Sequence, residues 1–379
     1  MEDAKIATNE SWRAETMALQ FLTQCQLTLR FCCPGFVLGL VGEAKTSYGE
    51  AVAMQLAPVV KSFSVAQMMP EIIAGMPYAN LEQMCVHLLP KDDFAEIANA
   101  GPGGAILILD EMPDATPMTQ SACHRLFTHG EAGSLKFPER TAIIGMGNPP
   151  DQSTTGGSFA EAIATRVCQI GWTGVPAEVY DAFRLEHAAA VASNSSAEWP
   201  TPGIYELPKD WTRMIPEVAR KFVAFRRAHA SCRKSRAQAN STLNGMLLGR
   251  AAPAANSRTW EYAEYLVAAC DAFGESATRT RYLLLAGLIG EAAAMQFLTY
   301  EKNLDLPDPE DCLSGMPRLP REGHMLMAVC QSVVAAVLSN NTCKRFEQAW
   351  DFLGRVADET GMLDMPATAC TPLVQNFPK

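Results

Sequence analysis

The chain has 379 residues, of which 48% are hydrophobic and 19% are charged, a composition that excludes a wholly disordered or fibrous protein. At about 150 residues per domain, this length predicts two or three domains. Lysine and arginine number 31 against 41 aspartate and glutamate residues, so the net charge is −10. Because an acidic surface repels phosphate groups, this charge argues against a protein that binds nucleic acid or an anionic membrane surface.

Three further features predict a cytoplasmic protein. The most apolar stretch, residues 283–295, is short and contains Glu291, so we expect no membrane span. Residues 1–5 lack the basic-then-apolar order of a secretory signal. The 12 cysteines form no CxxC motif, which favours reduced and mostly buried thiols.

The first half of the chain has the pattern of an α/β fold. Apolar residues recur at helical spacing over residues 11–30, which predicts an amphipathic helix. Short, almost entirely apolar runs follow, typical of strands covered on both faces: residues 36–41, 105–109, 141–146 and 167–170. Because helical segments such as residues 48–56 alternate with these runs, we expect a parallel sheet with helices on both faces. Ligands bind such sheets at the carboxyl ends of the strands.

The second half of the chain is predicted to be helical. Residues 192–208 are rich in Ser, Asn, Pro and Gly, which indicates a linker or a long loop. Helical patterns then cover residues 213–231, 260–272, 279–300, 321–338 and 343–359. The last dozen residues contain prolines without periodicity, so we expect a tail. We therefore predict an α/β core over residues 1–190, an all-α lid over 205–300 and a helical C-terminal extension over 301–379.

The loop after the first strand has the context of a phosphate-binding loop, which needs small residues between a buried strand and a helix N-terminus. The full GxxxxGK[ST] pattern is not present after Gly42. In the alignment that we prefer, the loop is three residues short: Ala44 replaces the second glycine, and Lys45 and Thr46 are the phosphate and metal residues. In the alternative, nothing is deleted and Tyr48 and Gly49 take those two places.

Polar residues also follow two other strands. Asp110 and Glu111 come directly after the apolar run 105–109, and Asn148 follows the run 141–146. An aspartate at a strand end can hold hydrated Mg²⁺, and the adjacent glutamate can activate water for attack on a phosphoryl group. The amide of Asn148 could orient the same water.

In their order along the chain, these motifs resemble the MoxR branch of the AAA+ ATPases. The resemblance covers about residues 10–300 and rests on GEAKTS (42–47), ILILDEM (106–112), IIGMGNPP (143–150), ATRV (164–167) and NSRTWE (256–261). It implies an AAA+ core with a P-loop and a helical lid, with Gly42, Ala44, Lys45 and Thr46 as nucleotide ligands. It also implies Asp110 and Thr46 for Mg²⁺, Glu111 for water activation and Asn148 as sensor 1.

The resemblance also implies assembly and partners. Arg166 sits where family members carry an arginine finger that reaches into a neighbouring subunit, and Arg258 matches the sensor 2 of the lid. Family members form hexameric rings that remodel proteins, often beside a partner with a von Willebrand factor A domain. A hairpin is predicted within residues 127–140, and such insertions line the pore in this branch.

One leading hypothesis and two rivals follow. The leading hypothesis is a MoxR-like ring subunit that binds ATP and Mg²⁺ between subunits and remodels a protein partner. The first rival is a pseudo-ATPase scaffold that has lost nucleotide binding, since a shortened loop offers fewer N–H groups to phosphate. The second rival is a nucleic-acid motor, suggested by the basic residues of segment 220–236, which we interpret instead as a solvated helix or a subunit contact.

Overall fold

The computed structural model describes residues 2–376 apart from residues 30, 31, 154–158, 196, 275, 276, 303–306, 308, 316, 317 and 341. The chain divides into two compact units. Unit 1 comprises Met1–Trp211 and Lys234–Ala294, and unit 2 comprises Thr212–Arg233 and Met295–Lys379. The helix expected at residues 213–231 thus belongs to unit 2. The division into core, lid and extension stays a prediction.

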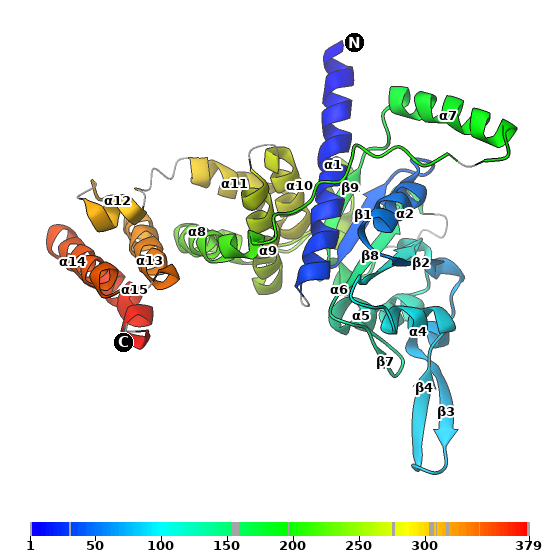
Figure 1. Ribbon diagram of the computed structural model, residues 1–379, viewed down its shortest axis with the longest axis horizontal. Helices are drawn as coiled ribbons and strands as arrows, with labels where there is room; N and C mark the ends of the chain where they lie inside the picture. Colours follow the sequence, from blue (N-terminus) through cyan, green and yellow to red (C-terminus); the bar gives the residue numbers. More distant parts are fainter. Residues whose placement is uncertain are drawn as a thin grey trace. The chain divides into compact units, whose positions relative to one another are not determined.

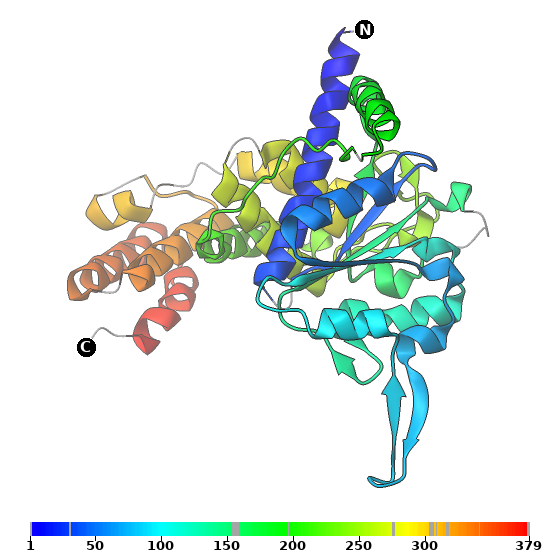
Figure 2. The ribbon, with the colours of Figure 1, turned by 45° about the vertical axis from the view of Figure 1, so that its right-hand side comes forward.

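The centre of unit 1 is a five-stranded parallel sheet with the strand order β2-β5-β8-β1-β9 (Figures 1 and 2). Its strands are β1 (Gly35–Gly39), β2 (Val59–Ser64), β5 (Ala105–Asp110), β8 (Thr141–Gly147) and β9 (Cys168–Trp172). The predicted parallel α/β fold is therefore confirmed. The sequence does not predict β2, because Lys61 and Ser62 interrupt its apolar residues. This strand lies at the edge of the sheet and is largely half-buried.

Helices cover both faces of the sheet, as expected. Right-handed crossovers place the helix between β1 and β2 on one face and the helices of the other three crossovers on the opposite face. The first is α2 (Lys45–Leu56), and the others are α4 (Asp92–Ala98), α5 (Pro117–His129) and α6 (Glu161–Ala164). The long helix α1 (Glu2–Thr28) packs beside α2, where the Thr16 and Tyr48 hydroxyls are 2.8 Å apart.

Two antiparallel hairpins extend from this core. The predicted one is confirmed as β6 (Glu131–Ala132) and β7 (Leu135–Lys136). A longer one, β3 (Met76–Asn80) with β4 (Cys85–Leu89), projects away from the sheet (Figure 1) and was not predicted. Its large apolar side chains are exposed: Met76, Tyr78, Leu81, Met84, Val86 and Leu89.

The rest of unit 1 is helical. The unpredicted α7 (Ala177–Ala192) is followed by a long loop that lies within unit 1, so of the two alternatives, a linker or a long loop, the structure shows a loop. α9 (Ser257–Phe273) starts with a capping box in which the Asn256 side chain accepts from the Thr259 N–H. α10 (Thr278–Ile289) ends at Gly290, whose φ of +85° stops the helix, so the helix predicted over 279–300 is two helices. A Cβ at Gly287 would lie 1.9 Å from the Gln169 carbonyl oxygen, so only glycine allows α10 to approach β9 this closely.

Unit 2 is a bundle of helices with its own apolar core. Its helices are α8 (Ile215–Ala228), most of α11 (Glu291–Lys302), α12 (Pro309–Ser314), α13 (Gly323–Ser339), α14 (Cys343–Thr360) and α15 (Asp364–Gln375). The prediction of a tail over the last dozen residues is wrong, because α15 buries Ala369 and Leu373 in this core. Pro366 lies in the first turn, where its missing N–H costs no hydrogen bond, while Pro372 lies inside the helix and leaves one backbone carbonyl without its N–H donor. In the part of the chain that the structure describes, no helix is both long and apolar enough to span a bilayer.

Candidate active site

The loop between β1 and α2 presents a helix N-terminus at the carboxyl edge of the sheet. Gly42 and Ala44 adopt left-handed conformations with φ of +85° and +54°, and α2 starts at Lys45. No described side chain caps α2, so the N–H groups of its first turn are open to an anion. This geometry favours the shortened alignment. The alternative fails because Tyr48 is buried against α1 and Gly49 lies under the Met146 side chain.

Lys45 is held at the centre of this edge. Its side chain is buried, and Nζ donates to the carbonyl oxygens of Gly39 (2.9 Å) and Leu40 (2.6 Å) and to Oδ1 of Asn148 (2.8 Å). Burial lowers the pKa of Lys45, while the carboxylates of Asp110 and Glu43 act in the opposite direction. All three ammonium protons therefore have acceptors within the protein.

The carboxylates after β5 face the same loop. The Thr46 hydroxyl donates to Oδ2 of Asp110, and the other oxygen of Asp110 accepts from the Glu111 N–H at 2.7 Å. Glu111 has a φ of +55°, and its carboxylate accepts a hydrogen bond from the Ser64 hydroxyl. A left-handed conformation is unusual for glutamate and costs of the order of 1 kcal/mol, which is typical of residues held in place for function.

Strand order explains why these residues meet. β8 lies between β1 and β5, so Asn148, which follows β8, sits between the phosphate loop and Asp110. The sequence predicted Lys45, Thr46, Asp110, Glu111 and Asn148 as one site, and the structure brings them together. It adds Ser64 at the end of β2 and Gln152, whose Oε1 accepts from the Val41 N–H at 3.1 Å. Neither had a sequence signal, because β2 itself was not predicted and Gln152 belongs to no motif.

The donor set suits Mg²⁺. Thr46 and Asp110 offer a hydroxyl and a carboxylate, and Mg²⁺ is bound in nucleotide sites by few protein oxygens together with phosphate and water. No cluster of three or more His, Cys, Asp or Glu residues that could hold a metal by itself is found among the described residues. These residues therefore fit a metal that arrives with a phosphate ligand.

The two predicted arginines lie elsewhere. Arg166 comes just before β9, whose first residue Cys168 pairs with Gly35 at the start of β1. It is therefore at the amino edge of the sheet, about 16 Å from the carboxyl edge at roughly 3.3 Å per residue of a five-residue strand. Among the described residues, no hydrogen bond or ion pair joins Arg166 or Arg258 to Lys45, Asp110 or Glu111.

Arg166 and Arg258 are close to each other. Burial and then the charge of Arg258 lower the pKa of Arg166. The pKa of His124 on α5 is lowered by burial and by the charges of Arg166, His129 and Arg258. Arg166 is anchored through the Ala162 carbonyl oxygen, while its buried Nε has no partner among the described residues. The amino edge thus carries a positively charged cluster.

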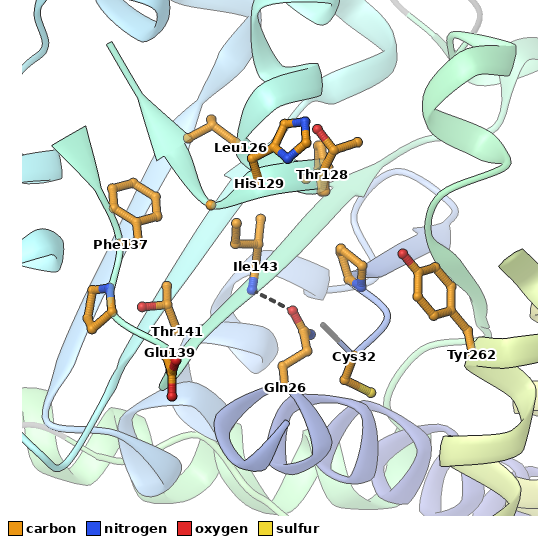
Figure 3. Close-up of a pocket in the computed structure, with 14 residues that line it drawn as sticks. Gln26, Cys32, Leu126, Thr128, His129, Phe137, Glu139, Thr141, Ile143 and Tyr262 are labelled. Atoms are coloured by element: carbon orange, nitrogen blue, oxygen red, sulfur yellow. Dashed lines mark hydrogen bonds between the residues drawn. The ribbon is translucent and has the colours of Figure 1, made fainter. Parts of the chain in front are cut away.

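A cavity of about 80 Å³ also opens at the amino edge (Figure 3). Gln26 Oε1 accepts from the Ile143 N–H at 2.9 Å, while Gln26 Nε2 and Thr141 Oγ1 are buried without described partners. This volume has room for a few water molecules and is too small for a nucleotide.

Glu15 is a buried carboxyl that sequence analysis missed. It lies on α1 and accepts hydrogen bonds from the Thr173 N–H and hydroxyl, both at 2.9 Å, beside the carboxyl end of β9. Burial raises its pKa from the ordinary 4.5 to about 7, although the hydrogen bonds of Thr173 and Ser11 and the charge of Arg279 act against this shift.

Glu15→Gln is expected to change the pH dependence of stability. Because the folded pKa is raised, the stability that comes from protonated Glu15 is fully present below pH 4.5 and is lost as pH rises through about 7. Relative to wild type, the variant should gain roughly 3 kcal/mol of unfolding free energy between pH 4.5 and pH 8. Urea unfolding at both pH values measures this gain, and a difference that does not vary with pH would contradict the assignment.

Comparison with known proteins gives structural likenesses but no family and no curated relative. No family model matches the chain, and no curated protein matches it. The chain is similar to a solved structure described as "a putative ATPase from Cytophaga hutchinsonii", with 15% sequence identity and a TM-score of 0.39. The similarity covers 76% of this chain and 92% of that chain. At this level of similarity we draw no functional conclusion from it, so the function proposed below rests on the residues of this chain.

Proposed function

We propose that this chain is an AAA+ ATPase subunit of the MoxR type, which binds ATP with Mg²⁺ at the carboxyl edge of its sheet. The observation that carries the proposal is the meeting of Lys45, Thr46, Asp110, Glu111 and Asn148, which follow three different strands and share one hydrogen-bonded cluster. A parallel sheet with helices on both faces agrees with an AAA+ core.

Each residue of the cluster has a chemical task in this proposal. The N-terminus of α2 and Lys45 bind the outer phosphates, and Nζ exchanges some of its present acceptors for phosphate oxygens. Thr46 and Asp110 would hold Mg²⁺, which when bound neutralises charge on the phosphate oxygens. The carboxylate of Glu111, which the Ser64 hydroxyl holds in position, accepts the proton of the attacking water. Asn148 orients that water beside the γ-phosphoryl group.

The amino-edge arginines are proposed to act on the site of a neighbouring subunit. Arg166 and Arg258 lie on the edge opposite to the Lys45 cluster of their own chain, so a second copy must bring them to a nucleotide. Their charge is unpaired among the described residues and suits the charge that develops on phosphoryl oxygens. A closed ring, which we expect to be hexameric, gives every site such a neighbour.

ATP hydrolysis per chain is therefore expected to depend on protein concentration. Dilution separates subunits and removes Arg166 from each site, so the specific rate should fall by at least about a hundredfold between assembled and monomeric protein. Phosphate release measured across a dilution series, with sedimentation velocity on the same samples, checks this. A constant specific rate in samples shown to be monomeric would contradict a shared site.

We propose that the ring remodels or assembles a protein partner and that a protein with a von Willebrand factor A domain is the kind of partner to test first. The exposed apolar hairpin β3–β4 supports contact with protein rather than nucleic acid, because between Met76 and Leu89 its only charged residue is the acidic Glu82.

One observation favours the alternative, a ring scaffold that does not hydrolyse ATP. The three protons of Lys45 are all bonded within the protein, and the shortened loop leaves few N–H groups to surround a β-phosphate. In that case the same cluster would tie β1, β5 and β8 together as a structural element. Measured nucleotide affinity separates the two functions.

A further inference from the structure

A groove on unit 2 runs between α8, α13 and α15 and has a volume of about 380 Å³. Its walls are apolar stripes with the spacing i, i+3, i+7 on α8 and i, i+1, i+4 on α13, both typical of helix faces that pack against another helix. The residues are Pro216, Ala219 and Val223 on α8, and Val334, Ala335 and Leu338 on α13. Ala369 and Pro372 of α15 close one side.

The groove borders the apolar core of unit 2, to which its lining residues Val334 and Ala369 also belong. α8 buries a different face, with Val218, Phe222 and Phe225, so the groove stripe is a second apolar face of the same helix. Its small side chains would let another backbone come close. A helix that lies along α13 from residue 331 to residue 338 would cover about 10 Å, or two turns, at 1.5 Å per residue.

One cation in this groove is without a partner. Arg220 is half-buried, makes no hydrogen bond or ion pair with any described residue, and has a buried Nε. Burial lowers the pKa of Arg220, and the charge of the nearby Glu217, which forms an ion pair with Lys221 at 3.0 Å, acts in the opposite direction. On the α13 side of the groove, Oε1 of Gln331 is also buried and accepts no hydrogen bond from a described residue. The groove therefore combines an apolar lining with a guanidinium whose buried Nε has no partner among the described residues.

The geometry points to a docking site for an amphipathic helix of a protein partner that carries a carboxylate within its apolar stripe. Charge complementarity selects the carboxylate, because an aspartate or glutamate would satisfy Arg220 in a partly dehydrated setting. The two helical stripes select a helix, because ridges of a third helix fit the channel between two packed ones. The inference does not depend on ATP hydrolysis, since all the residues involved belong to unit 2.

The test uses a synthetic probe and the full chain without nucleotide. The probe is a fluorescent, end-capped 18-residue peptide of Leu, Ala and Gln with Leu at i, i+3, i+4 and i+7 and one central Glu beside the Leu stripe; its twin carries Lys instead. By fluorescence anisotropy, the Glu peptide should bind about tenfold more tightly than its twin or better. Arg220→Glu should reverse this preference, and Arg220→Gln should abolish it.

Arg227→Glu is the matched control, because Arg227 is exposed on the same helix and does not line the groove. It should keep the wild-type preference, and circular dichroism should show all variants equally folded. Equal binding of the two peptides, or the same loss in Arg227→Glu as in Arg220→Glu, would overturn the inference. Binding of decanoate by a chain that binds neither peptide would also overturn it, because the groove would then hold a fatty acid and not a helix. A change of oligomeric state in Arg220→Glu would do so as well, because it would make a second copy of this chain the occupant.

Discussion

Glu111→Gln is expected to lower ATP hydrolysis by about 10²–10⁴-fold while ATP affinity stays within a few-fold of wild type. The amide keeps the size of the side chain and can still contact the Ser64 hydroxyl, but it cannot take a proton from water. Because Lys45, Thr46 and the N-terminus of α2 are untouched, the phosphates keep their ligands. Steady-state phosphate release and calorimetric ATP titration measure the two quantities on the same protein.

The control for this variant is Glu71→Gln, an exposed glutamate on the short helix α3 (Pro70–Ala74) that makes no contact with the cluster. It should hydrolyse ATP at the wild-type rate. If Glu111→Gln retained full activity, Glu111 could not be the base. If Glu111→Gln lost ATP binding to the same extent as hydrolysis, the role of Glu111 would be to hold the nucleotide-binding loop in its conformation and not to activate water.

Arg166→Ala is expected to lower hydrolysis by about 10³–10⁵-fold, the size measured for arginine fingers in other nucleotide hydrolases. The reason is electrostatic, because alanine removes a positive charge that is proposed to stabilise the neighbouring phosphoryl group in the transition state. ATP affinity should change less than the rate, since the Lys45 site belongs to the other chain. Rates and affinities of the purified variant test this split.

Mixing two inactive variants tests whether Arg166 acts between subunits. In rings formed from equal amounts of Arg166→Ala and Glu111→Gln chains, about a quarter of the interfaces combine an intact Glu111 with an intact Arg166, so part of the activity should return. Arg125→Ala is a suitable control, because Arg125 is an exposed arginine on α5 that pairs with Glu131. Mixed rings as inactive as either variant, despite shown exchange of subunits, would place Arg166 outside the site.

The sequence predicted the centre of the sheet because its strands are buried on both faces. β1, β5, β8 and β9 are almost wholly apolar. Because the strands are parallel, their carboxyl ends lie at one edge of the sheet, so polar residues that follow them are predicted to lie together. The positions of Asp110 and Asn148 follow from this rule, whereas Lys45 also needed the phosphate-loop pattern. The choice between two loop alignments needed the structure, because only the burial of Tyr48 decides it.

What the sequence missed depends on contacts between distant segments. β2 has a mixed pattern because it is an edge strand, so Ser64 could not be placed beside Glu111. The hairpin β3–β4 exposes its apolar residues, which periodicity assigns to a buried face. α15 is a helix in spite of Pro366 and Pro372, because its other face is buried in the core of unit 2. The proximity of Arg166 and Arg258 comes from residues 92 positions apart and has no local signal.

Calorimetric titration of the chain with ATP and Mg²⁺ tests most directly whether the strand ends form a nucleotide site. We predict binding of one ATP per chain and loss of that binding in Lys45→Met, which keeps the length of the buried side chain without its charge. The melting temperature of the variant in the absence of ATP serves to show that it is folded. No heat of binding in the wild-type chain at millimolar ATP would contradict this account and leave the cluster of Lys45, Asp110 and Asn148 as a structural element of a ring scaffold.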